Sequence, residues 1–252
     1  MSTSGIPVLA QPAWRTCLDV EGQAADHYDD FVLTPLFGMF ERDPVNVLEI
    51  GCAGGAFGAE LKRRYPGSIV TGIDAGEAAA KQAASRIDRV IQARLDFCNL
   101  ENEGLRHGEF DTLVAADILE HLVNPWALLE RLRPFLTADA QVLVSIPNVR
   151  NITVSTELLL GGKFEYAERG LLDVTHLRFF TLDSIERMFQ QTGYVVESRR
   201  SIVLPSLQKL YDSYSGAGSV TVKFGRMTLS DVSAQELVEL CAAQFLLRCR
   251  PA

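Results

Sequence analysis

Residues 47–58 read VLEIGCAGGAFG, an apolar run that ends in an acidic residue and a glycine-rich turn before a helical pattern begins. Glycine has no Cβ and tolerates positive φ, so such a turn lets a ligand approach the backbone closely. In open α/β sheets ligands bind at the carboxyl ends of the strands, which is where this turn falls. A second apolar run, Val70 to Ile73, ends at Asp74, whose carboxylate can accept hydrogen bonds from ribose hydroxyls. Together these features predict a nucleoside-binding site.

The glycine spacing excludes two common nucleotide-binding motifs. A dinucleotide fingerprint requires glycines at positions i, i+2 and i+5, and no register of this turn supplies them, since Gly51 is followed at i+2 by Ala53. The chain also lacks a phosphate loop of the G-x-x-x-x-G-K-S/T type. The expected ligand is therefore a nucleoside that neither motif would bind.

Strand patterns alternate with helical patterns along the chain, which predicts a parallel, doubly wound α/β sheet. The expected strands cover residues 46–50, 69–73, 89–92, 110–116, 141–146, 194–198 and 244–250, the last of which also fits a continued helix. The expected helices cover residues 57–65, 77–87, 125–136 and 182–191, and a capping box at 233–236 opens another. Residues 1–40 are expected to form an N-terminal helical segment or lid. Residues 41–252 would form the main domain, with substrate-side insertions near 149–180 and 203–232.

The composition indicates a globular enzyme. The chain has 252 residues, of which 47% are hydrophobic, and a net charge of −8. No basic patch for nucleic acid stands out, and no segment approaches the ~18 apolar residues of a membrane span. Five cysteines without a Cys-x-x-Cys pair, and an N-terminus unlike a secretory signal, predict a reduced, cytoplasmic protein. The sequence leaves the oligomeric state open.

Glu49, Gly51 and Gly55 form a Glu-x-Gly-x-x-x-Gly pattern that resembles motif I of class I S-adenosylmethionine-dependent methyltransferases. That family commonly has glycine where this chain has Ala53. With later motifs in the right order, the resemblance covers roughly residues 45–202 and the last strand. It implies a seven-stranded, mostly parallel, Rossmann-like sheet with an antiparallel last strand. It also implies S-adenosylmethionine as the cofactor, whose sulfonium cation suits an acidic strand end.

The resemblance implies which residues bind the cofactor. Asp74 matches the acidic residue that binds the ribose, and Asp96 with Phe97 resembles the pair that receives adenine. A turn carboxylate and a core ring are the alternatives for that pair. The segment from Phe110 to Asp117 resembles motif IV. The implied cofactor-binding residues are Glu49, Gly51, Ala53, Gly55, Asp74, Asp96, Phe97 and Asp117.

His121 and His176 are the candidate catalytic residues. A hydroxyl acceptor must lose its proton, and an imidazole near the end of the fourth strand has a pKa suited to neutral pH. Packing or hydrogen bonding is the alternative for each. Asp117, Glu120 and His121 stand at i, i+3 and i+4, so on a helix they would share a face that could hold Mg²⁺. A metal-free role in cofactor contact and hydrogen bonding is favoured, and no metal ligand is assigned.

Two stretches, residues 117–126 and 171–181, resemble bacterial methyltransferases found alongside glycosyltransferases in polysaccharide assembly. This association predicts O-methylation of a small-molecule acceptor, a sugar or glycan precursor. The spacing of Asp117, Glu120 and His121 also occurs in some quinone-precursor O-methyltransferases, which keeps a small aromatic acceptor open. A scaffold that binds the cofactor without catalysis is the alternative from another class.

Overall fold

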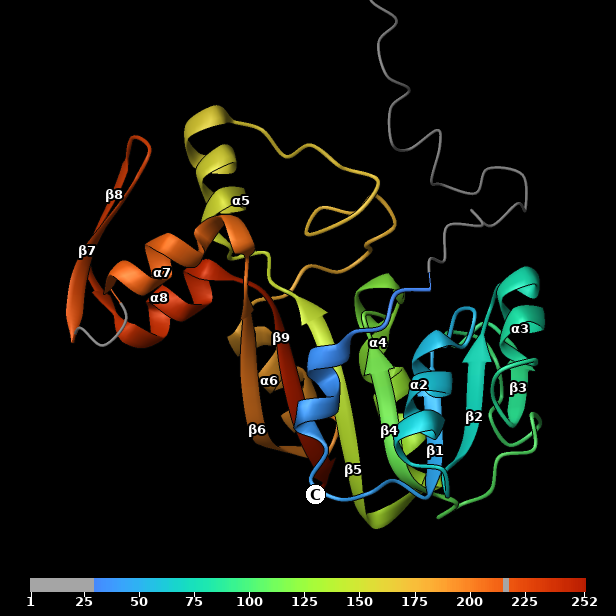
Figure 1. The fold of residues 1–252 in the computed structure, drawn as a ribbon. Coiled ribbons are helices and arrows are strands. Elements are labelled where there is room, and N and C mark those ends of the chain that lie inside the picture. The colour runs from blue at the N-terminus through green and yellow to red at the C-terminus, as the bar shows by residue number, and fades with distance from the viewer. Residues whose placement is uncertain (1–29, 215–217) are drawn as a thin grey trace, which may run out of the picture.

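The computed structural model describes residues 30–214 and 218–252, which form a twisted sheet with helices on both faces (Figure 1). The sheet has seven strands in the order β3-β2-β1-β4-β5-β9-β6. The strands are β1 Asn46–Ile50, β2 Ile69–Asp74, β3 Arg89–Gln92, β4 Phe110–Ala116, β5 Leu136–Pro147, β6 Tyr194–Val203 and β9 Ala242–Pro251. Strands β1 to β5 pair in parallel, whereas β9 is antiparallel to both β5 and β6. The predicted fold class is confirmed, and the last element is a strand rather than a helix.

Helices and short helical turns connect the strands. They are η1 Thr34–Met39, α2 Ala56–Arg64, α3 Glu77–Ala83, η2 Leu119–His121, α4 Pro125–Leu132, η3 Arg133–Phe135, α5 Ile152–Thr156, η4 Glu157–Gly161, α6 Leu182–Gln191, η5 Pro205–Leu207, α7 Gln208–Tyr214 and α8 Ala234–Cys241. The predicted capping box of α8 is present, since Ser233 and Glu236 each accept the other's backbone N–H. Among the described residues, no helix has the length and apolar character needed to cross a bilayer.

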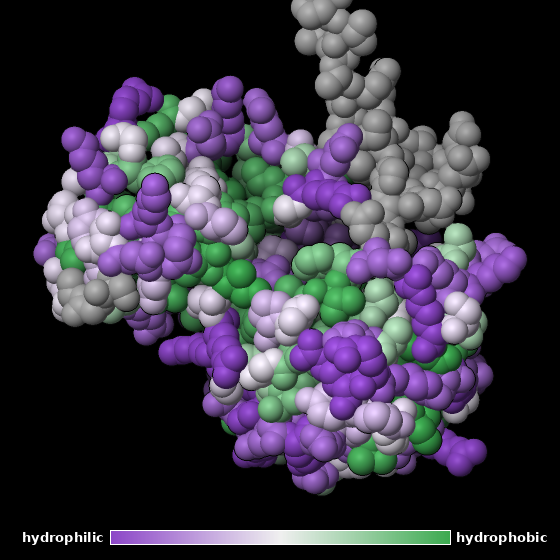
Figure 2. Space-filling model, in the orientation of Figure 1, coloured by the Kyte–Doolittle hydropathy of each residue, from purple (hydrophilic) through white to green (hydrophobic). Residues whose placement is uncertain are grey.

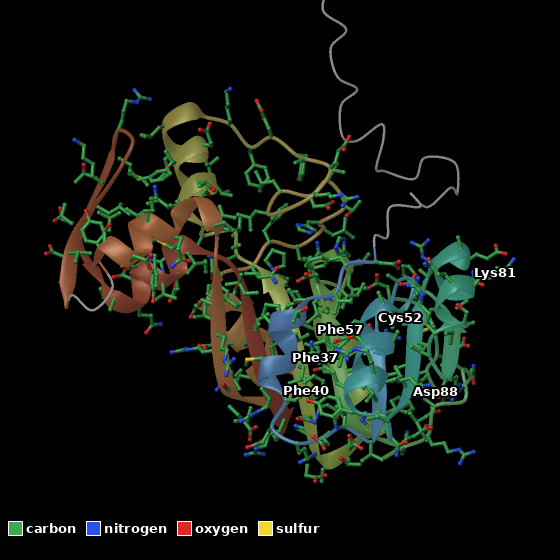
Figure 3. All side chains as sticks on the ribbon, in the orientation of Figure 1. Phe37, Phe40, Cys52, Phe57, Lys81 and Asp88 are labelled. Atoms are coloured by element: carbon green, nitrogen blue, oxygen red, sulfur yellow. The ribbon has the colours of Figure 1, made fainter. Side chains whose placement is uncertain are left out.

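Alternating side chains of the central strands build a hydrophobic core on each face of the sheet. Leu48 and Ile50 of β1 belong to the core that α4 and α6 cover, whereas Val47 belongs to the core under η1 and α2. On this second face the rings of Phe37 and Phe57 stack with centroids 4.5 Å apart, and Figure 3 shows them between η1 and α2. Packing on both faces thus fixes the sheet that carries the loops.

Two predicted helices end earlier than their sequence patterns suggest. Helix α3 ends at Ala83 rather than at position 87, because Asp88 turns back to the sheet. Its carboxylate accepts a hydrogen bond from the N–H of Val70 at 2.8 Å, and its own N–H donates to the Val70 carbonyl. Helix α4 ends at Leu132, since Pro134 has no N–H to continue the α-helical hydrogen bonds, and the chain goes on as the short 3₁₀ turn η3.

Two buried asparagines fasten a smaller unit to the end of β5. This unit comprises α5, α7, α8 and the hairpin of β7 Ser219–Phe224 and β8 Met227–Ser233, and it lies beyond the end of β5, where β6 ends and β9 begins (Figure 1). The amide of Asn148 donates to the carbonyls of Glu239 and Ala242 at 2.6 and 3.0 Å, and the amide of Asn151 donates to Ala242 at 2.8 Å. The hairpin falls within the predicted insertion at residues 203–232. Its substrate-side role, like that of residues 149–180, stays a prediction.

The expected N-terminal segment lies mostly outside the described residues. Of residues 1–40 the structure describes 30–40, which contain η1. Leu36 and Phe37 of η1 are buried against the sheet core. The lid predicted for this segment stays a prediction.

We expect Asn148→Ala to lower the free energy of unfolding by about 1–3 kcal/mol, because it removes two buried hydrogen bonds and takes the side-chain donor away from the Glu239 carbonyl. Urea unfolding followed by circular dichroism measures this loss. Asn102→Ala, at an exposed position, is the matched control and should change stability by less than about 0.5 kcal/mol. Equal stability of the two variants would show that Asn148 does not hold the smaller unit to β5.

Candidate functional site

The turn between β1 and α2 has no space for a side chain at Gly51 or at Gly55. Gly51, Ala53 and Gly55 have φ values of 68°, 46° and 76°. A Cβ added at Gly51 would lie 2.6 Å from the side chain of Ile118, and one at Gly55 would lie 2.9 Å from the backbone of Ala83. Both glycines are therefore required by the backbone conformation and by close packing. Ala53 adopts the same left-handed region with a single methyl group.

Asp74, the last residue of β2, holds this turn in place. One of its carboxylate oxygens accepts the N–H of Ala53 at 2.8 Å, and the other accepts the N–H of Gly76 at 2.8 Å. The N–H of Gly51 donates to the carbonyl of Ile73 at 2.8 Å. Each carboxylate oxygen has two lone pairs, so one on each remains for a ligand. Asp74 thus orders the turn, a role that the sequence pattern did not predict.

Glu49 lies buried under the same turn. Glu49 is 4% exposed, and its Oε2 has no hydrogen-bond partner among the described residues. Burial, helped by the nearby carboxylate of Asp74, raises the pKa of Glu49 to about 8, although a backbone hydrogen bond at Gly58 opposes this rise. Glu49, Asp74 and Asp117 bring three acidic side chains to the carboxyl ends of β1, β2 and β4. When these carboxyl groups are ionised they favour a cationic ligand, and a bound cation would in turn lower the pKa of each.

The two residues predicted to receive adenine have different surroundings. The carboxylate of Asp96 accepts the N–H groups of Val123 and Asn124 at 3.1 and 3.2 Å, so it fastens the loop before α4 as the turn-carboxylate alternative expected. Phe97 is 71% exposed, which excludes the core-ring alternative. Its ring is accessible at the same edge, with the guanidinium of Arg94 at 6.0 Å from the centroid.

The predicted helical face of Asp117, Glu120 and His121 does not form. Asp117 has a φ of 49°, which lies outside the α-helical region, and the turn η2 that follows spans only three residues in 3₁₀ geometry. One carboxylate oxygen of Asp117 accepts the hydroxyl of Ser145 at 2.6 Å. Burial raises the pKa of Asp117. Asp117 is therefore tied to β5 rather than stacked above Glu120 and His121.

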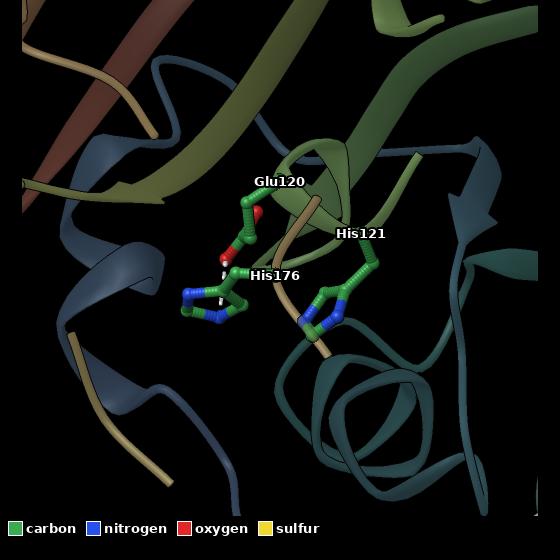
Figure 4. A group of neighbouring side chains, drawn as sticks. All are labelled: Glu120, His121 and His176. Carbon is green, nitrogen blue, oxygen red and sulfur yellow. Dashed lines mark ion pairs between the residues drawn. The ribbon is translucent and has the colours of Figure 1, made fainter. Parts of the chain in front are cut away.

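His176, rather than Asp117, lies beside Glu120 and His121. The N–H groups of Leu177 and Arg178 both donate to the backbone carbonyl of Glu120, which brings this distant segment against η2. The rings of His121 and His176 have centroids 4.8 Å apart, and Nε2 of His176 lies 4.0 Å from Oε1 of Glu120 (Figure 4). The sequence singled out both histidines, but not that they meet.

Burial controls the charges in this cluster of Glu120, His121 and His176. Glu120 is 1% exposed, neither of its oxygens has a hydrogen-bond partner among the described residues, and burial raises its pKa well above the ordinary value. Burial also lowers the pKa of His121, and that of His176 to about 4. Nδ1 of His121 lies 3.3 Å from the carbonyl of Thr175. Since a carbonyl can only accept, Nδ1 carries the proton and Nε2 keeps its lone pair.

Two surface cavities lie away from this edge of the sheet. One of about 430 Å³ is lined by α6 and β6, and one of about 390 Å³ lies between η1 and β6. No predicted site residue lines either cavity. The candidate site is therefore defined by the side chains at the strand ends.

We expect the cofactor-free protein to lose stability as the pH rises from about 5 to 8. Glu49 has an ordinary pKa of 4.5 and a folded pKa of about 8, so the folded state binds the extra proton between these values. Stability is fully present below the lower value and is lost as the pH rises through the upper one. The loss should be on the order of 1–4 kcal/mol by urea unfolding.

Glu49→Gln should reduce this pH dependence by the contribution of Glu49, because the amide does not titrate, while the buried carboxyl groups of Asp117 and Glu120 keep the rest. Glu130→Gln, on the exposed side of α4, is the matched control and should keep it. If Glu49→Gln and the unsubstituted protein respond to pH with the same slope, Glu49 is not the titrating group.

Comparison with known proteins identifies the family. A family model described as a methyltransferase domain matches residues 21–199. Malonyl-[acyl-carrier protein] O-methyltransferase of Geobacter sulfurreducens is 26% identical over 155 residues, which are 60% of this chain and 56% of that protein. A ubiquinone biosynthesis O-methyltransferase of Psychrobacter arcticus is 27% identical over 184 residues, 71% of this chain and 68% of that protein. The match thus spans little more than half the length of the first relative.

Solved structures share the fold. An S-adenosylmethionine-dependent methyltransferase from Mesorhizobium loti has a TM-score of 0.55 at 14% identity, over 86% of this chain and 96% of that one. The plantazolicin methyltransferase BpumL, solved in complex with SAH, has a TM-score of 0.54 at 16% identity, over 86% of this chain and 80% of that one. The family match covers most of the chain, and the sheet order, the glycine turn and the acidic strand ends agree with it. The chain therefore belongs to the methyltransferase-domain family, the class I S-adenosylmethionine-dependent methyltransferases.

Proposed function

We propose that this methyltransferase transfers the methyl group to a hydroxyl of an apolar, ring-containing small molecule. The observation that carries this proposal is the buried cluster of Glu120, His121 and His176, which follows directly after Asp117 at the end of β4. When bound, S-adenosylmethionine supplies an electrophilic methyl carbon on a sulfonium. The protein must then hold an acceptor oxygen in line and dispose of its proton.

The strand ends fit the proposed cofactor. The turn at Gly51 and Gly55 packs closely against Ile118 and Ala83, so its left-handed backbone requires both glycines of the predicted cofactor motif. Two acceptors lie beside this turn: Asp74, which accepts the N–H of Ala53 and keeps further lone pairs, and the buried Oε2 of Glu49, which has no partner among the described residues. We therefore assign cofactor binding to the residues predicted from the sequence, with Asp96 acting through the loop that it fastens. They are Glu49, Gly51, Ala53, Gly55, Asp74, Asp96, Phe97 and Asp117.

We assign activation of the acceptor to His121 and His176. The hydrogen bond of His121 to Thr175 fixes the ring and leaves the Nε2 lone pair unused. Methyl transfer would join the acceptor oxygen to the methyl carbon while the carbon–sulfur bond breaks and leaves its electron pair on sulfur. The hydroxyl proton must leave the oxygen in the same event, so the cluster has to lower the cost of that loss.

An apolar surface beside the cluster favours an apolar acceptor. The rings of Phe164 and Tyr166 contact each other and the ring of Phe179, which lies 6.2 Å from that of His176. Several hydrophobic side chains between residues 158 and 177 are exposed; they are Leu158, Leu159, Leu160, Phe164, Tyr166 and Leu177. Figure 2 shows hydrophobic surface on the part that carries α5, α7 and α8, along the side facing the sheet. A phenol or quinone precursor, as in the names of the ubiquinone relatives, suits such a surface.

The sugar acceptor predicted from the sequence is the second candidate. Exposed rings such as Phe164 and Tyr166 can also pack on the apolar face of a sugar ring. The exposed leucines have no matching partner on a sugar, which places this acceptor behind a phenol.

We expect Asp74→Ala to weaken S-adenosylmethionine binding by about 1–3 kcal/mol, because it removes charge-assisted hydrogen bonds and the tie to Ala53. Calorimetric titration measures this loss, and a thermal melt verifies that the variant is folded. Asp139→Ala, an exposed aspartate at the start of β5, is the matched control and should leave affinity unchanged. Unchanged affinity in folded Asp74→Ala would contradict the assignment.

We expect His121→Asn and His176→Asn to lower methyl transfer by about 10²–10⁴-fold while S-adenosylmethionine affinity stays within about twofold. Tritium-methyl transfer to a panel of phenols and nucleotide sugars provides the assay. His107→Asn, an exposed histidine paired with Glu101, is the control and should keep full activity. Cofactor binding without turnover on any acceptor, and no effect of either substitution, would favour the non-catalytic scaffold instead.

A further inference from the structure

Glu120, His121 and His176 together offer more lone pairs without a partner than the binding of one acceptor hydroxyl would use. Each residue offers one donor atom, and the three atoms lie within 4.8 Å of one another (Figure 4). Both oxygens of Glu120 are buried without a hydrogen-bond partner among the described residues. A buried carboxylate without a partner is costly, and a bound cation is one of the few partners that would compensate it.

We propose that Glu120, His121 and His176 form a binding site for one divalent transition-metal ion. This inference deepens the proposed function, and its binding test does not require methyl transfer. The ligand set differs from the Asp117, Glu120 and His121 set considered from the sequence, because Asp117 is engaged by Ser145.

The donor atoms select the class of ion. Two imidazole nitrogens with one carboxylate oxygen suit zinc and neighbouring first-row ions, whereas Mg²⁺ prefers oxygen ligands. Three protein ligands leave at least one coordination position open, as in catalytic zinc sites. Bonds of about 2.0–2.2 Å in tetrahedral geometry place ligand atoms about 3.4 Å apart. Oε1 of Glu120 and Nε2 of His176, now 4.0 Å apart, would reach this spacing through small side-chain rotations.

Residues around the cluster contact the two imidazoles in the way that neighbouring residues usually orient metal-binding histidines. Nδ1 of His121 is held by the carbonyl of Thr175, and the Thr175 hydroxyl donates in turn to Asp173 at 2.6 Å. Against the larger effect of burial, the backbone of Leu171 raises the pKa of His176. Metal-binding histidines typically donate their second nitrogen to a carbonyl or carboxylate in this way.

The position of the site suggests what the ion would do. His121 is only partly buried, which leaves an access route for water or an acceptor oxygen. A divalent ion held by the three residues would bind the acceptor oxygen at its open coordination position. It would lower the pKa of the acceptor hydroxyl, so that the proton leaves to solvent water. The cluster would then act as a Lewis acid, with His121 and His176 as ligands rather than as the proton acceptor.

The test is metal binding to the full chain after chelator treatment and desalting. We expect Zn²⁺ titration by calorimetry to give one site per chain, and Co²⁺ to give a visible absorption band of a site with nitrogen ligands. Glu120→Gln and His176→Asn should each weaken Zn²⁺ binding by about 100-fold or more. His107→Asn, which changes a surface histidine beside a glutamate, should have no effect.

Glu120→Gln is the informative variant, because a neutral amide should fold at least as well as a buried carboxylate. Zn²⁺ should raise the melting temperature of the unsubstituted protein but not that of Glu120→Gln. Failure to bind Zn²⁺ or Co²⁺ stoichiometrically, or equal binding by Glu120→Gln, would overturn the metal site. Full turnover of chelator-treated protein would also overturn it, while leaving the proposed methyl transfer intact.

Discussion

The hydrogen bond from the Ala53 N–H to the carboxylate of Asp74 is the contact on which the site depends. It joins the glycine turn after β1 to the end of β2, and the N–H of Gly51 adds a second tie to the carbonyl of Ile73. Because the paired strands are parallel, their carboxyl ends meet at one edge. The glycine turn after β1 and the carboxylates at the ends of β2 and β4 therefore lie along the same edge of the sheet.

Two carboxyl groups at this edge are buried without complete hydrogen bonding. Glu49 lies under the turn, and Glu120 lies in the neighbouring cluster after β4. Burial raises the pKa of both groups, so each costs stability when it ionises without a partner. Such groups are uncommon in folded proteins unless a ligand completes them. Glu49 belongs to the proposed cofactor site and Glu120 to the proposed metal site. Both proposed sites thus involve a buried carboxyl group that a bound cation would stabilise.

The strand positions followed from local sequence because each strand is a short apolar run whose side chains alternate between two cores, as Val47 and Leu48 do. Helix ends were less predictable. The end of α3 depends on a hydrogen bond between Asp88 and Val70 on a neighbouring strand, which no local pattern contains. The end of α4 was readable in principle, since Pro134 marks it locally.

The sequence by itself determined the individual strand segments, the glycine turn and the acidic strand ends, because each is encoded within about ten consecutive residues. Only the tertiary structure decided that His176 joins Glu120 and His121. That meeting depends on backbone hydrogen bonds from Leu177 and Arg178 to the Glu120 carbonyl, between segments far apart in the chain. It also decided that Asp117 is tied to Ser145. Burial and long-range hydrogen bonds set these partners, and neither is a property of a local sequence pattern.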